Sequence, residues 1–397
     1  MSLIEEAKGI KDTIISHRRY IHQHAELAHD LPLTRAYVME YLTKLGYEPK
    51  EMGDGVVAVA GGKKPGKVFM IRGDMDALPI IEESDLPFKS ETKYMHACGH
   101  DMHTSMMLGA AELLKNHEDE IEGQVKLMFQ PAEETLTGAK SMIDEGLMEN
   151  PKVDAAFMIH VMPGTKYKTG SVLVQQPGIG SSAADWFEIH VQGKGCHGAM
   201  PNTGVDPINV VAHIVTALQE IHAREMPTGS SLALTIGQIH GGAVSNVVPD
   251  TAYMTGTIRT VDTDLRKFVK QRMVEIAEGV AKSFRASAEV KFTTECPSVL
   301  SDEITRNEIE SYCKNIIDDK MVIDTANLKG LFMAGSEDFA LVAERVPSAF
   351  AALSAGALDD GYTHPLHHPK ARFDEDTMPN GAAIYAGCAM EWLKNHK

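Results

Sequence analysis

The sequence predicts a discontinuous α/β domain that is interrupted by a smaller α+β domain, and three observations lead to this prediction. Buried apolar strands alternate with helices through the first half of the chain. Near residue 184 the pattern changes to the every-second-residue alternation of half-buried strands. After the next hundred or so residues, the mixture of helix and strand returns. We therefore assign residues 1–183 and 298–397 to the α/β domain and residues 184–297 to the inserted domain.

Three apolar strands separated by helices define the first half. The strands are expected at 67–74 (KVFMIRGD), 123–134 (GQVKLMFQPAEE) and 153–161 (VDAAFMIHV). Helical periodicity covers the segments around them, at 13–28, 33–46, 104–117 and 136–147. Buried strands connected through helices indicate a sheet that is covered on both faces. Because such sheets bind ligands at the carboxyl ends of their strands, the polar residues that end these strands are expected at one edge.

The inserted segment is predicted to form strand, helix, two strands, helix and strand. Its strands are DWFEIHVQG, SLALTIGQIHGG, DTAYMTGTIRTV and ASAEVKFTT, and its helices cover 205–224 and 263–283. This order, together with the length of the segment, predicts a ferredoxin-like α+β domain. The residues that follow contain a strand, SAFAALSAG, and a last helix at 379–394, and these return to the α/β domain.

Composition restricts the partners of the protein. The 397 residues are 43% hydrophobic and 23% charged, which is typical of globular chains. The 55 acidic and 38 basic residues give a formal net charge of -17, which disfavours nucleic acid and membrane surfaces as partners. We expect no signal peptide and no membrane span, because no stretch has the required apolar pattern. Five scattered cysteines do not resemble a disulfide framework, so a cytoplasmic location is expected.

The stretch MHACGHDMHTS, residues 95–105, concentrates three histidines, a cysteine and an aspartate. Cys98 and His100 are two residues apart, so both side chains can face one ion in an extended stretch. A thiolate and an imidazole suit zinc, and with added carboxylates they also suit manganese, cobalt or nickel. Taken alone, the pair also fits a buried thiol beside a hydrogen-bonded histidine.

Further candidate ligands end the neighbouring strands. Glu133 and Glu134 follow a buried strand, where adjacent side chains point in different directions. One glutamate can then bind an ion while the other faces a bound water. The alternative is a charge pair that opens a helix, where carboxylates are favoured by the helix dipole. His160 ends the next strand, and alone it would be interpreted as a core histidine.

Six motifs occur in the order that is found in one family of enzymes: MHACGHDMHT, QPAEE, KGCHGAMP, SNVVPD, GSEDF and LHHPKARFDED. In these motifs the chain resembles amidohydrolases of the hippurate hydrolase, auxin-conjugate hydrolase and bacterial aminoacylase group. That group is a branch of the two-metal aminoacylase and carboxypeptidase family, and the resemblance runs from residue 18 to the last helix. It implies a two-metal exopeptidase-like catalytic domain with helices on both faces of a mixed sheet, and an inserted ferredoxin-like lid and dimerisation domain.

Carried over position by position, the resemblance implies two divalent metal ions per subunit, with Zn, Mn, Co and Ni as the candidates. The implied ligands are Cys98, His100, Glu134, His160 and His367. The family pattern of leucine, histidine, any residue and proline matches LHHP, and it selects His367 over its neighbours His364 and His368. Glu133 matches the general base of the family.

The chain departs from the wider family at the end of the first strand. Asp74 stands where the wider family has a metal-binding histidine, so we do not assign Asp74 as a ligand. Asp76 and Asp101 are expected to orient ligands, because metal-binding groups need carboxylates in this role. Helix capping is the alternative for Asp101. His22 and Glu26, one helical turn apart, are expected to pack near the site as support.

Four more residues are expected, from the resemblance, to contact the substrate. His197 matches a histidine that approaches the oxyanion, often from the partner subunit of a dimer. Asn246 and Arg259 match positions that face the cleft, and Arg259 could bind a substrate carboxylate through two parallel hydrogen bonds. Gly335 is expected to line the pocket near that carboxylate. The alternatives are a solvent-exposed turn for His197 and an exposed strand position for Arg259. The resemblance also implies a homodimer that forms through the inserted domain.

Together these residues predict hydrolysis of N-acyl-L-amino acids, of the hippurate hydrolase or aminoacylase type, with release of a carboxylic acid and a free amino acid. The expected partner is therefore a small-molecule substrate. One alternative is a metallo-dipeptidase or carboxypeptidase with the same two-metal site. A second alternative is non-enzymatic, with a structural metal site and a lid that serves as a binding module. Five ligands beside a spare glutamate favour the open, catalytic kind of site.

Overall fold

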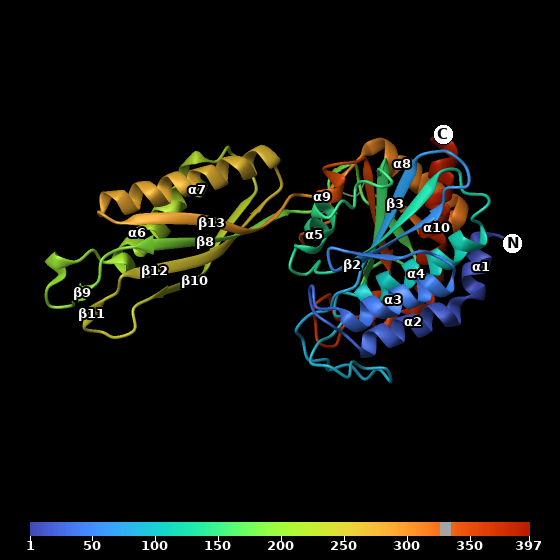
Figure 1. Cartoon of the computed structure of the whole chain (residues 1–397), viewed down its shortest axis with the longest axis horizontal. Coiled ribbons are helices and arrows are strands. Elements are labelled where there is room, and N and C mark those ends of the chain that lie inside the picture. Colours follow the sequence, from blue (N-terminus) through green and yellow to red (C-terminus); the bar gives the residue numbers. More distant parts are fainter. Residues whose placement is uncertain (326–334) are drawn as a thin grey trace. The chain divides into compact units, whose positions relative to one another are not determined.

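A computed structural model describes residues 1–325 and 335–397. The described residues form two compact units, which we call the α/β unit and the inserted unit. The α/β unit holds 1–180, 299–325 and 338–397, and the inserted unit holds 181–298 and 335–337. Figure 1 shows the elements of each unit, and both chain termini belong to the α/β unit.

The described part of the α/β unit is built on an eight-stranded sheet with the order β1-β2-β4-β3-β5-β16-β6-β15. Its strands are β1 (Lys50–Met52), β2 (Gly55–Gly61), β3 (Val68–Asp74), β4 (Gln124–Gln130), β5 (Ala155–Met162), β6 (Val172–Val174), β15 (Val322–Asp324) and β16 (Ser348–Ser354). Strand β3 is parallel to β4 and β5, and β16 is parallel to β5. The pairs β1–β2, β2–β4 and β6–β16 are antiparallel. The predicted mixed sheet is confirmed.

Two long helices, α4 (His100–Asn116) and α10 (Met378–Asn395), pack against each other and against β3 and β5. The other α-helices of the unit are α1 (Leu3–Gly9), α2 (Lys11–Gln23), α3 (Pro32–Lys44), α5 (Gly138–Asp144), α8 (Glu303–Ile316) and α9 (Ala340–Ala343). Helix α2 packs on α4, and α8 packs on α10 and β16. Within residues 1–325 and 335–397, no helix is both long and apolar enough to cross a membrane.

The end of α2, the end of β4 and the start of α4 are among the boundaries that differ from those expected from the sequence. Helix α2 ends earlier than expected, and the chain then turns through Ala28, which has a φ of +49°. Strand β4 ends at Gln130, so the two adjacent glutamates lie in the turn that follows it. Helix α4 begins four residues earlier than expected, directly after Gly99, whose φ is +89°. A Cβ atom on Gly99 would lie 2.4 Å from Cγ2 of Val161, so both conformation and packing require glycine here.

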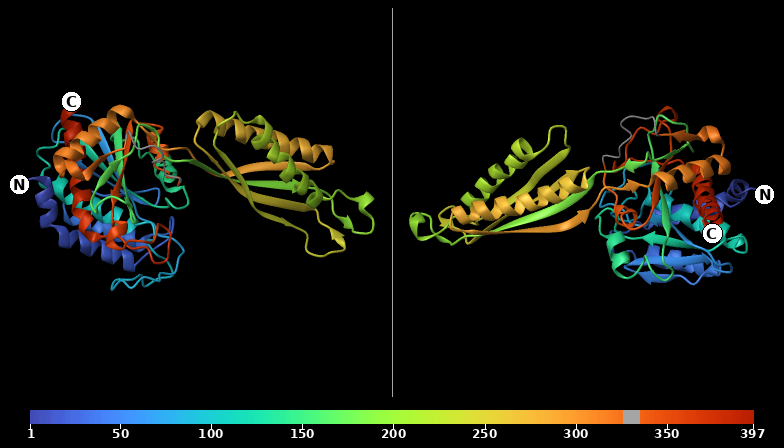
Figure 2. Two further views of the ribbon diagram at one scale, coloured as in Figure 1. Left: turned by 180° about the vertical axis from the view of Figure 1, so that it is seen from behind. Right: turned by 90° about the horizontal axis from the view of Figure 1, so that it is seen from above.

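The inserted unit contains a four-stranded antiparallel sheet with the order β10-β12-β8-β13. Its strands are β8 (Ala183–Gln192), β10 (Leu232–Gly241), β12 (Thr251–Thr260) and β13 (Ser287–Cys296). Helices α6 (Pro207–Glu220) and α7 (Thr263–Ser283) lie on one side of this sheet, as Figure 2 shows. They bury alternate residues of β8, including Phe187, Ile189 and Val191. The predicted small α+β domain is confirmed.

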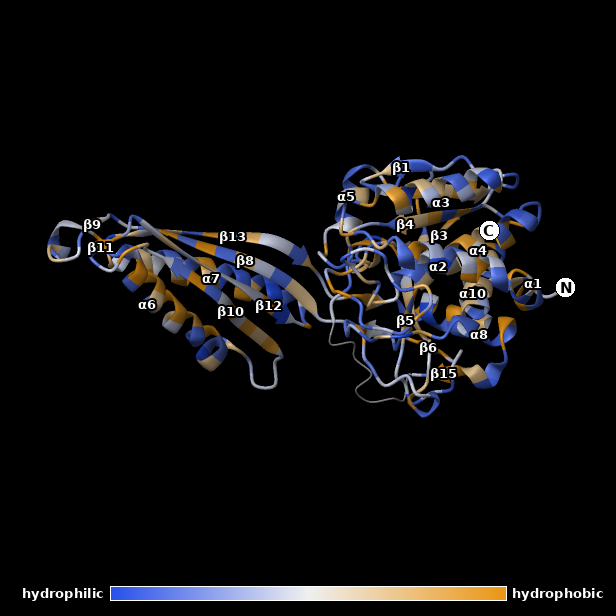
Figure 3. Ribbon diagram, turned by 90° about the horizontal axis from the view of Figure 1, so that it is seen from below, coloured by the Kyte–Doolittle hydropathy of each residue, from blue (hydrophilic) through white to orange (hydrophobic). Residues whose placement is uncertain are grey.

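Two pairs of two-residue strands complete the topology. In the inserted unit β9 (Cys196–His197) pairs with β11 (Val247–Val248), and in the α/β unit β7 (Gly178–Ile179) pairs with β14 (Leu300–Ser301). Helix α6 mixes hydrophobic and hydrophilic residues along its length, as Figure 3 shows. This is the pattern of a helix that buries one face and exposes the other.

Candidate metal centre and active site

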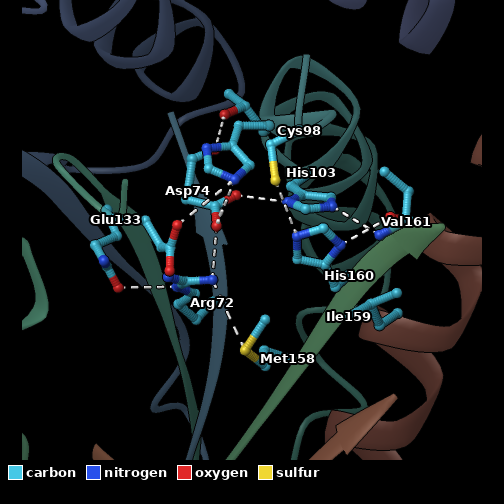
Figure 4. A network of polar contacts seen from close by, with 12 residues as sticks. Arg72, Asp74, Cys98, His103, Glu133, Met158, Ile159, His160 and Val161 are labelled. Atoms are coloured by element: carbon cyan, nitrogen blue, oxygen red, sulfur yellow. Dashed lines mark hydrogen bonds and ion pairs between the residues drawn. The ribbon is translucent and has the colours of Figure 1, made fainter. Parts of the chain in front are cut away.

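The carboxyl ends of β3, β4 and β5 meet at one edge of the sheet, because the three strands are parallel. Asp74 ends β3, the adjacent glutamates Glu133 and Glu134 follow β4, and His160 lies near the end of β5. Helix α4 begins at the same edge with His100. The sheet topology therefore gathers side chains that are far apart in the sequence, and Figure 4 shows part of this cluster.

The structure brings all five expected ligands and Glu133 into one place. Cys98 Sγ lies 3.5 Å from His160 Nε2 and 3.3 Å from His367 Nε2. His367 Nε2 lies 3.4 Å from Glu134 Oε1. His100 Nε2 is 4.0 Å from a carboxylate oxygen of each glutamate. We call these six residues the metal cluster: Cys98, His100, Glu133, Glu134, His160 and His367.

Among the overlapping groups that the ligand atoms of the metal cluster form, two contain Cys98, and each of these could hold a cation. In one group Cys98, His100 and His160 place their ligand atoms within 4.8 Å of one another. In the other, Cys98, Glu134 and His367 do the same. Cys98 belongs to both groups, so its sulfur lies between two candidate positions. A thiolate, imidazoles and a carboxylate together suit Zn, Mn, Co or Ni.

Two buried atoms of this cluster, His100 Nε2 and Glu134 Oε1, make no hydrogen bond among the described residues. Their nearest charged neighbours are Asp74 Oδ2, 3.5 Å from His100 Nε2, and His367 Nε2, 3.4 Å from Glu134 Oε1. A buried polar atom without a partner costs free energy, on the order of 1–3 kcal/mol. A divalent cation would satisfy both atoms at once. The side chains that are present therefore fit the metal ions that the sequence implies.

Hydrogen bonds fix how the ligands point. His100 Nδ1 lies 2.9 Å from the carbonyl oxygen of Asp76, which leaves Nε2 toward the cluster. The carboxylate of Asp76 accepts hydrogen bonds from the backbone N–H groups of Glu133, at 3.1 Å, and Glu134, at 3.2 Å. His160 Nδ1 is 2.7 Å from the carbonyl oxygen of Val161, so its Nε2 also faces the cluster. Asp76 is thus placed to orient three members of the cluster.

Burial sets the protonation of the sulfur and of one imidazole. It raises the pKa of the Cys98 thiol well above its ordinary value, and the carboxylates of Glu134 and Glu133 add to this effect. Burial also lowers the pKa of His160 well below its ordinary value. A neutral imidazole is ready to bind a metal ion, whereas the thiol must first lose its proton. A cation at this position would stabilise the thiolate.

The loop that carries His367 presents one histidine and turns two away. His367 has a φ of +64°, which is uncommon for a residue with a side chain, and its N–H donates to the carbonyl of Ala97 at 2.9 Å. The rings of His364 and His368 stack on each other instead, with centroids 4.3 Å apart. Within this loop, His367 is therefore the histidine that the structure places beside Cys98.

Asp101, the residue after His100, forms a second buried network with His22. Asp101 Oδ2 accepts from Arg18 Nε at 2.9 Å and lies 2.9 Å from His22 Nδ1. His22 Nε2 lies 3.1 Å from Glu82. Burial works against a charge on His22, but Asp101 and Glu82 outweigh it and raise its pKa to about 9. Glu26 does not join His22 and instead accepts from backbone N–H groups at the start of α3.

The sequence did not single out Arg72 and His103, yet both are fully buried partners of Asp74. Arg72 Nη1 donates to Asp74 Oδ2 at 2.7 Å, and His103 Nδ1 lies 2.5 Å from Asp74 Oδ1. Burial alone would raise the pKa of Asp74, but Arg72, His100 and His103 hold it well below its ordinary value. The available signals were an arginine within an apolar strand and a second histidine one turn after His100.

The remaining expected residues belong to the inserted unit. His197 is exposed, and its strand β9 pairs with β11, which directly follows Asn246. Arg259 is half-buried near the far end of β12, and its Nη1 donates to Ser336 Oγ at 3.2 Å. Gly335 precedes Ser336 and is exposed. The inserted unit therefore groups His197 with Asn246 and Arg259 with Gly335.

These two groups lie at opposite ends of β12. From Thr251, next to the β9–β11 pair, to Arg259 there are eight residues of extended strand, which span about 27 Å. A small N-acyl amino acid is much shorter than this distance. One such molecule cannot contact both His197 and Arg259 of the same chain.

Both the sequence and the fold of the chain are similar to those of known proteins. Peptidase family M20/M25/M40 matches residues 70–391. The chain is 37% identical to thermostable carboxypeptidase 1 of Saccharolobus solfataricus over 99% of both chains. It is 36% identical to N-acetyl-L-cysteine deacetylase of Bacillus subtilis over 93% of this chain and 85% of the other. The crystal structure of the Bacillus subtilis YXEP protein, a dinuclear metal binding peptidase from the M20 family, is 31% identical, with a TM-score of 0.78 over 98% of this chain and 99% of that chain.

These matches cover nearly the whole chain, including the residues that form the metal cluster. The resemblance found in the sequence is confirmed, and the non-enzymatic alternative is set aside. The chain belongs to peptidase family M20/M25/M40 and is a metallo-amidohydrolase of that family.

Proposed function

We propose that the protein hydrolyses the amide bond of N-acyl-L-amino acids, releasing a carboxylic acid and a free amino acid. The observation that carries this proposal is the convergence of Cys98, His100, Glu134, His160 and His367, with Glu133 beside them. The relative named N-acetyl-L-cysteine deacetylase supports an N-acyl amino acid as the substrate class.

In this proposal the five ligands hold two divalent cations. When bound, such ions supply Lewis acidity, which lowers the pKa of a water and polarises an amide carbonyl. The chain itself contributes the burial and the orientation of the ligands. Cys98, His100, Glu134 and His160 are buried or partly buried, and His367 is exposed. The imidazoles of His100 and His160 are oriented by hydrogen bonds that the carbonyl oxygens of Asp76 and Val161 accept.

Glu133 is the proposed general base. Its backbone N–H is held by Asp76, and a carboxylate oxygen lies 4.0 Å from His100 Nε2. In the first step, Glu133 takes one proton from the attacking water, whose oxygen bonds to the amide carbon. In the second step, the carbon–nitrogen bond breaks, and Glu133 gives that proton to the leaving amine. Glu134, whose carboxylate lies beside His367, remains a ligand.

His197 is proposed to stabilise the oxyanion and Arg259 to bind the carboxylate of the substrate. Because the two residues lie at opposite ends of β12, we infer that they serve different active sites. The protein would then act as a homodimer in which His197 reaches the site of the partner subunit. Asn246, beside His197, is proposed to border the substrate in the site of the partner subunit. Gly335, beside Ser336, is proposed to border the substrate that Arg259 binds.

A second candidate function is peptide hydrolysis, as a carboxypeptidase or dipeptidase. It is favoured by the relative named thermostable carboxypeptidase 1. A carboxyl-terminal residue of a peptide and an N-acyl amino acid share the free carboxylate and the adjacent amide, so the same site fits both.

A panel of substrates separates the two candidates. The protein, reconstituted with Zn, Mn, Co or Ni, is assayed with N-acetyl and N-benzoyl amino acids and with matched dipeptides and blocked peptides. The proposal predicts a higher kcat/KM for N-acyl amino acids than for any peptide that ends in the same residue. The opposite ranking would establish the peptidase instead.

A further inference from the structure

A chain of buried hydrogen bonds joins the ends of three elements beneath the metal cluster, as Figure 4 shows. It starts at Asp74, at the end of β3, passes through His103, in the first turns of α4, and reaches Val161, in β5. His103 is fully buried. None of these three residues is an expected ligand.

The partners of His103 define which ring nitrogen carries its proton. The backbone N–H of Val161 lies 2.8 Å from His103 Nε2, and because an N–H group can only donate, Nε2 must accept. The proton is therefore on Nδ1, which donates to Asp74 Oδ1 at 2.5 Å. Asp74 thus fixes the tautomer that lets His103 accept from β5.

Val161 also holds the neighbouring ligand. Its carbonyl oxygen accepts a hydrogen bond from His160 Nδ1 at 2.7 Å, and its N–H donates one to His103. The rings of His103 and His160 pack edge to face, with centroids 4.6 Å apart and planes at 70°. His160 Nε2 is left facing Cys98 Sγ at 3.5 Å. A shift of His103 would therefore disturb two contacts that aim His160: the hydrogen bond to the backbone of Val161 and the packing of the two rings.

Asp74 is firmly anchored for this task. Its Oδ2 accepts from Arg72 Nη1 at 2.7 Å, and its backbone carbonyl accepts from Thr104 Oγ1 at 2.6 Å. Arg72 is in turn bonded to Gln130 at 2.8 Å and to Asp338 at 3.2 Å. Both carboxylate oxygens of Asp74 already have close partners. Asp74, at the end of a central strand, therefore holds His103 in place.

We propose that His103, held by Asp74, is a positioning residue that aims His160 Nε2 at Cys98. The proposal rests on the metal-dependent function proposed above, because its consequence is metal affinity. In metal sites, partners that orient a ligand typically change affinity by about 10–100-fold when they are removed. Asp74 would thereby serve the site from the position where the wider family has a histidine ligand.

Two substitutions at one position separate the two hydrogen bonds of His103. In His103→Asn the amide nitrogen takes the place of Nδ1, so the donor to Asp74 is kept and the acceptor for Val161 is lost. In His103→Gln the amide oxygen reaches the place of Nε2 and keeps that acceptor. Thr104→Val is the matched control, because it removes one buried hydrogen bond to Asp74 from the same helix and leaves Val161 untouched.

The experiment measures Co2+ affinity of metal-free protein by competition with a chelator, the thiolate-to-Co2+ absorption band, and the thermal midpoint without metal. We expect His103→Asn to weaken one Co2+ equivalent by about 10–100-fold and to alter the absorption band. The Co2+ affinity of His103→Gln and of Thr104→Val should stay within about threefold of the wild-type affinity.

Wild-type affinity and absorption in His103→Asn, with a thermal midpoint lowered as in Thr104→Val, would overturn the positioning role and leave the proposed function intact. A wild-type protein that binds no Co2+ would contradict the proposed function and, with it, this inference. If His103→Asn does not fold, His103→Gln decides. In that variant, retained affinity supports the role of the acceptor, and a tenfold loss contradicts it.

Discussion

The two units hold their functional side chains in opposite ways. In the α/β unit, His100 and His160 are buried, and each has one ring nitrogen tied to a carbonyl oxygen, so that the other faces the metal cluster. In the inserted unit, His197 and Asn246 are exposed, and Arg259 is half-buried. Ligands that bind a cation need to be held in position before the ion binds. Residues that contact the substrate can remain exposed until the partner subunit completes the proposed site. The predictions below test this difference.

The largest effect is expected for Glu133→Gln. Loss of the general base should lower kcat by about 10³-fold, within the range known for proton transfer by a positioned side chain. Metal content should remain at the wild-type level, because Glu133 is not one of the five ligands. Steady-state kinetics and metal analysis of the purified variant check both parts. A variant with wild-type kcat would remove Glu133 from the mechanism.

The next effect concerns the inserted unit. His197→Ala should lower kcat by about 10²-fold, because it removes one oxyanion donor. If His197 serves the partner subunit, co-expression with Glu133→Gln should restore activity, since one site of each mixed dimer is then intact. About a quarter of all sites would be intact in a random mixture of the two subunits. Restoration is measured on the mixed dimer, isolated with two affinity tags.

No recovery in the mixed dimer would mean that His197 acts in its own chain or outside the chemistry. The two variants purified separately and then assayed together, without subunit exchange, serve as the control. They should show only the sum of their residual activities.

A smaller effect is expected for Arg259→Lys. Lysine keeps the charge but cannot make two parallel hydrogen bonds to a carboxylate, so KM should rise by about tenfold with little change in kcat. The matched substrate is an N-acyl amino acid amide, which lacks the carboxylate. Its turnover should not distinguish the variant from the wild type. An equal rise in KM for both substrates would contradict the proposed contact.

The smallest effect lies far from the metal cluster, at His17 in α2. Burial, aided by the charge of Lys44, lowers the pKa of His17 to about 4. The unfolded chain binds this proton near pH 6.5, but the folded protein does not. Stability is therefore complete above about pH 6.5 and falls as the pH drops toward 4.

Between pH 6.5 and 5.5 this group should cost about 1 kcal/mol of unfolding free energy. Urea unfolding of the wild type and of His17→Gln at both values measures it. Glutamine can keep the hydrogen bond to Tyr37, which in the wild type spans 2.7 Å, and it does not titrate. The same loss of stability in both proteins would assign the pH dependence to other groups.

The sequence was most informative where metal-binding residue types occur at the ends of buried strands. Spacing made Cys98 and His100 candidates, and the ends of buried strands made the two adjacent glutamates and His160 candidates. The family resemblance then assigned Cys98, His100, Glu134, His160 and His367 as ligands, and the structure gathers all five. The fold class followed from apolar runs and alternation, which directly report burial. Those patterns are local, so they can be found without knowing which strands are neighbours.

Asp76 was expected as a supporting residue, but the supporting roles of Arg72, Asp74 and His103 could not be found in this way. Arg72, Asp74 and His103 form their network only because β3, α4 and β5 come together in three dimensions. In the sequence, Arg72 is a charge in an apolar strand. Asp74 is two residues away, but the other partners, Gln130 and Asp338, are far along the chain. Strands β1 and β2 were missed as well. Strand β2 pairs with β4, more than sixty residues later, and the edge strand β1 pairs with β2.

The central claim is that the metal cluster binds two divalent ions. Crystals grown with zinc and measured by anomalous diffraction at the zinc edge test it directly. The account predicts two peaks per chain, each within about 2.3 Å of ligand atoms from Cys98, His100, Glu134, His160 or His367. A single peak, or peaks bound by other side chains, would contradict it.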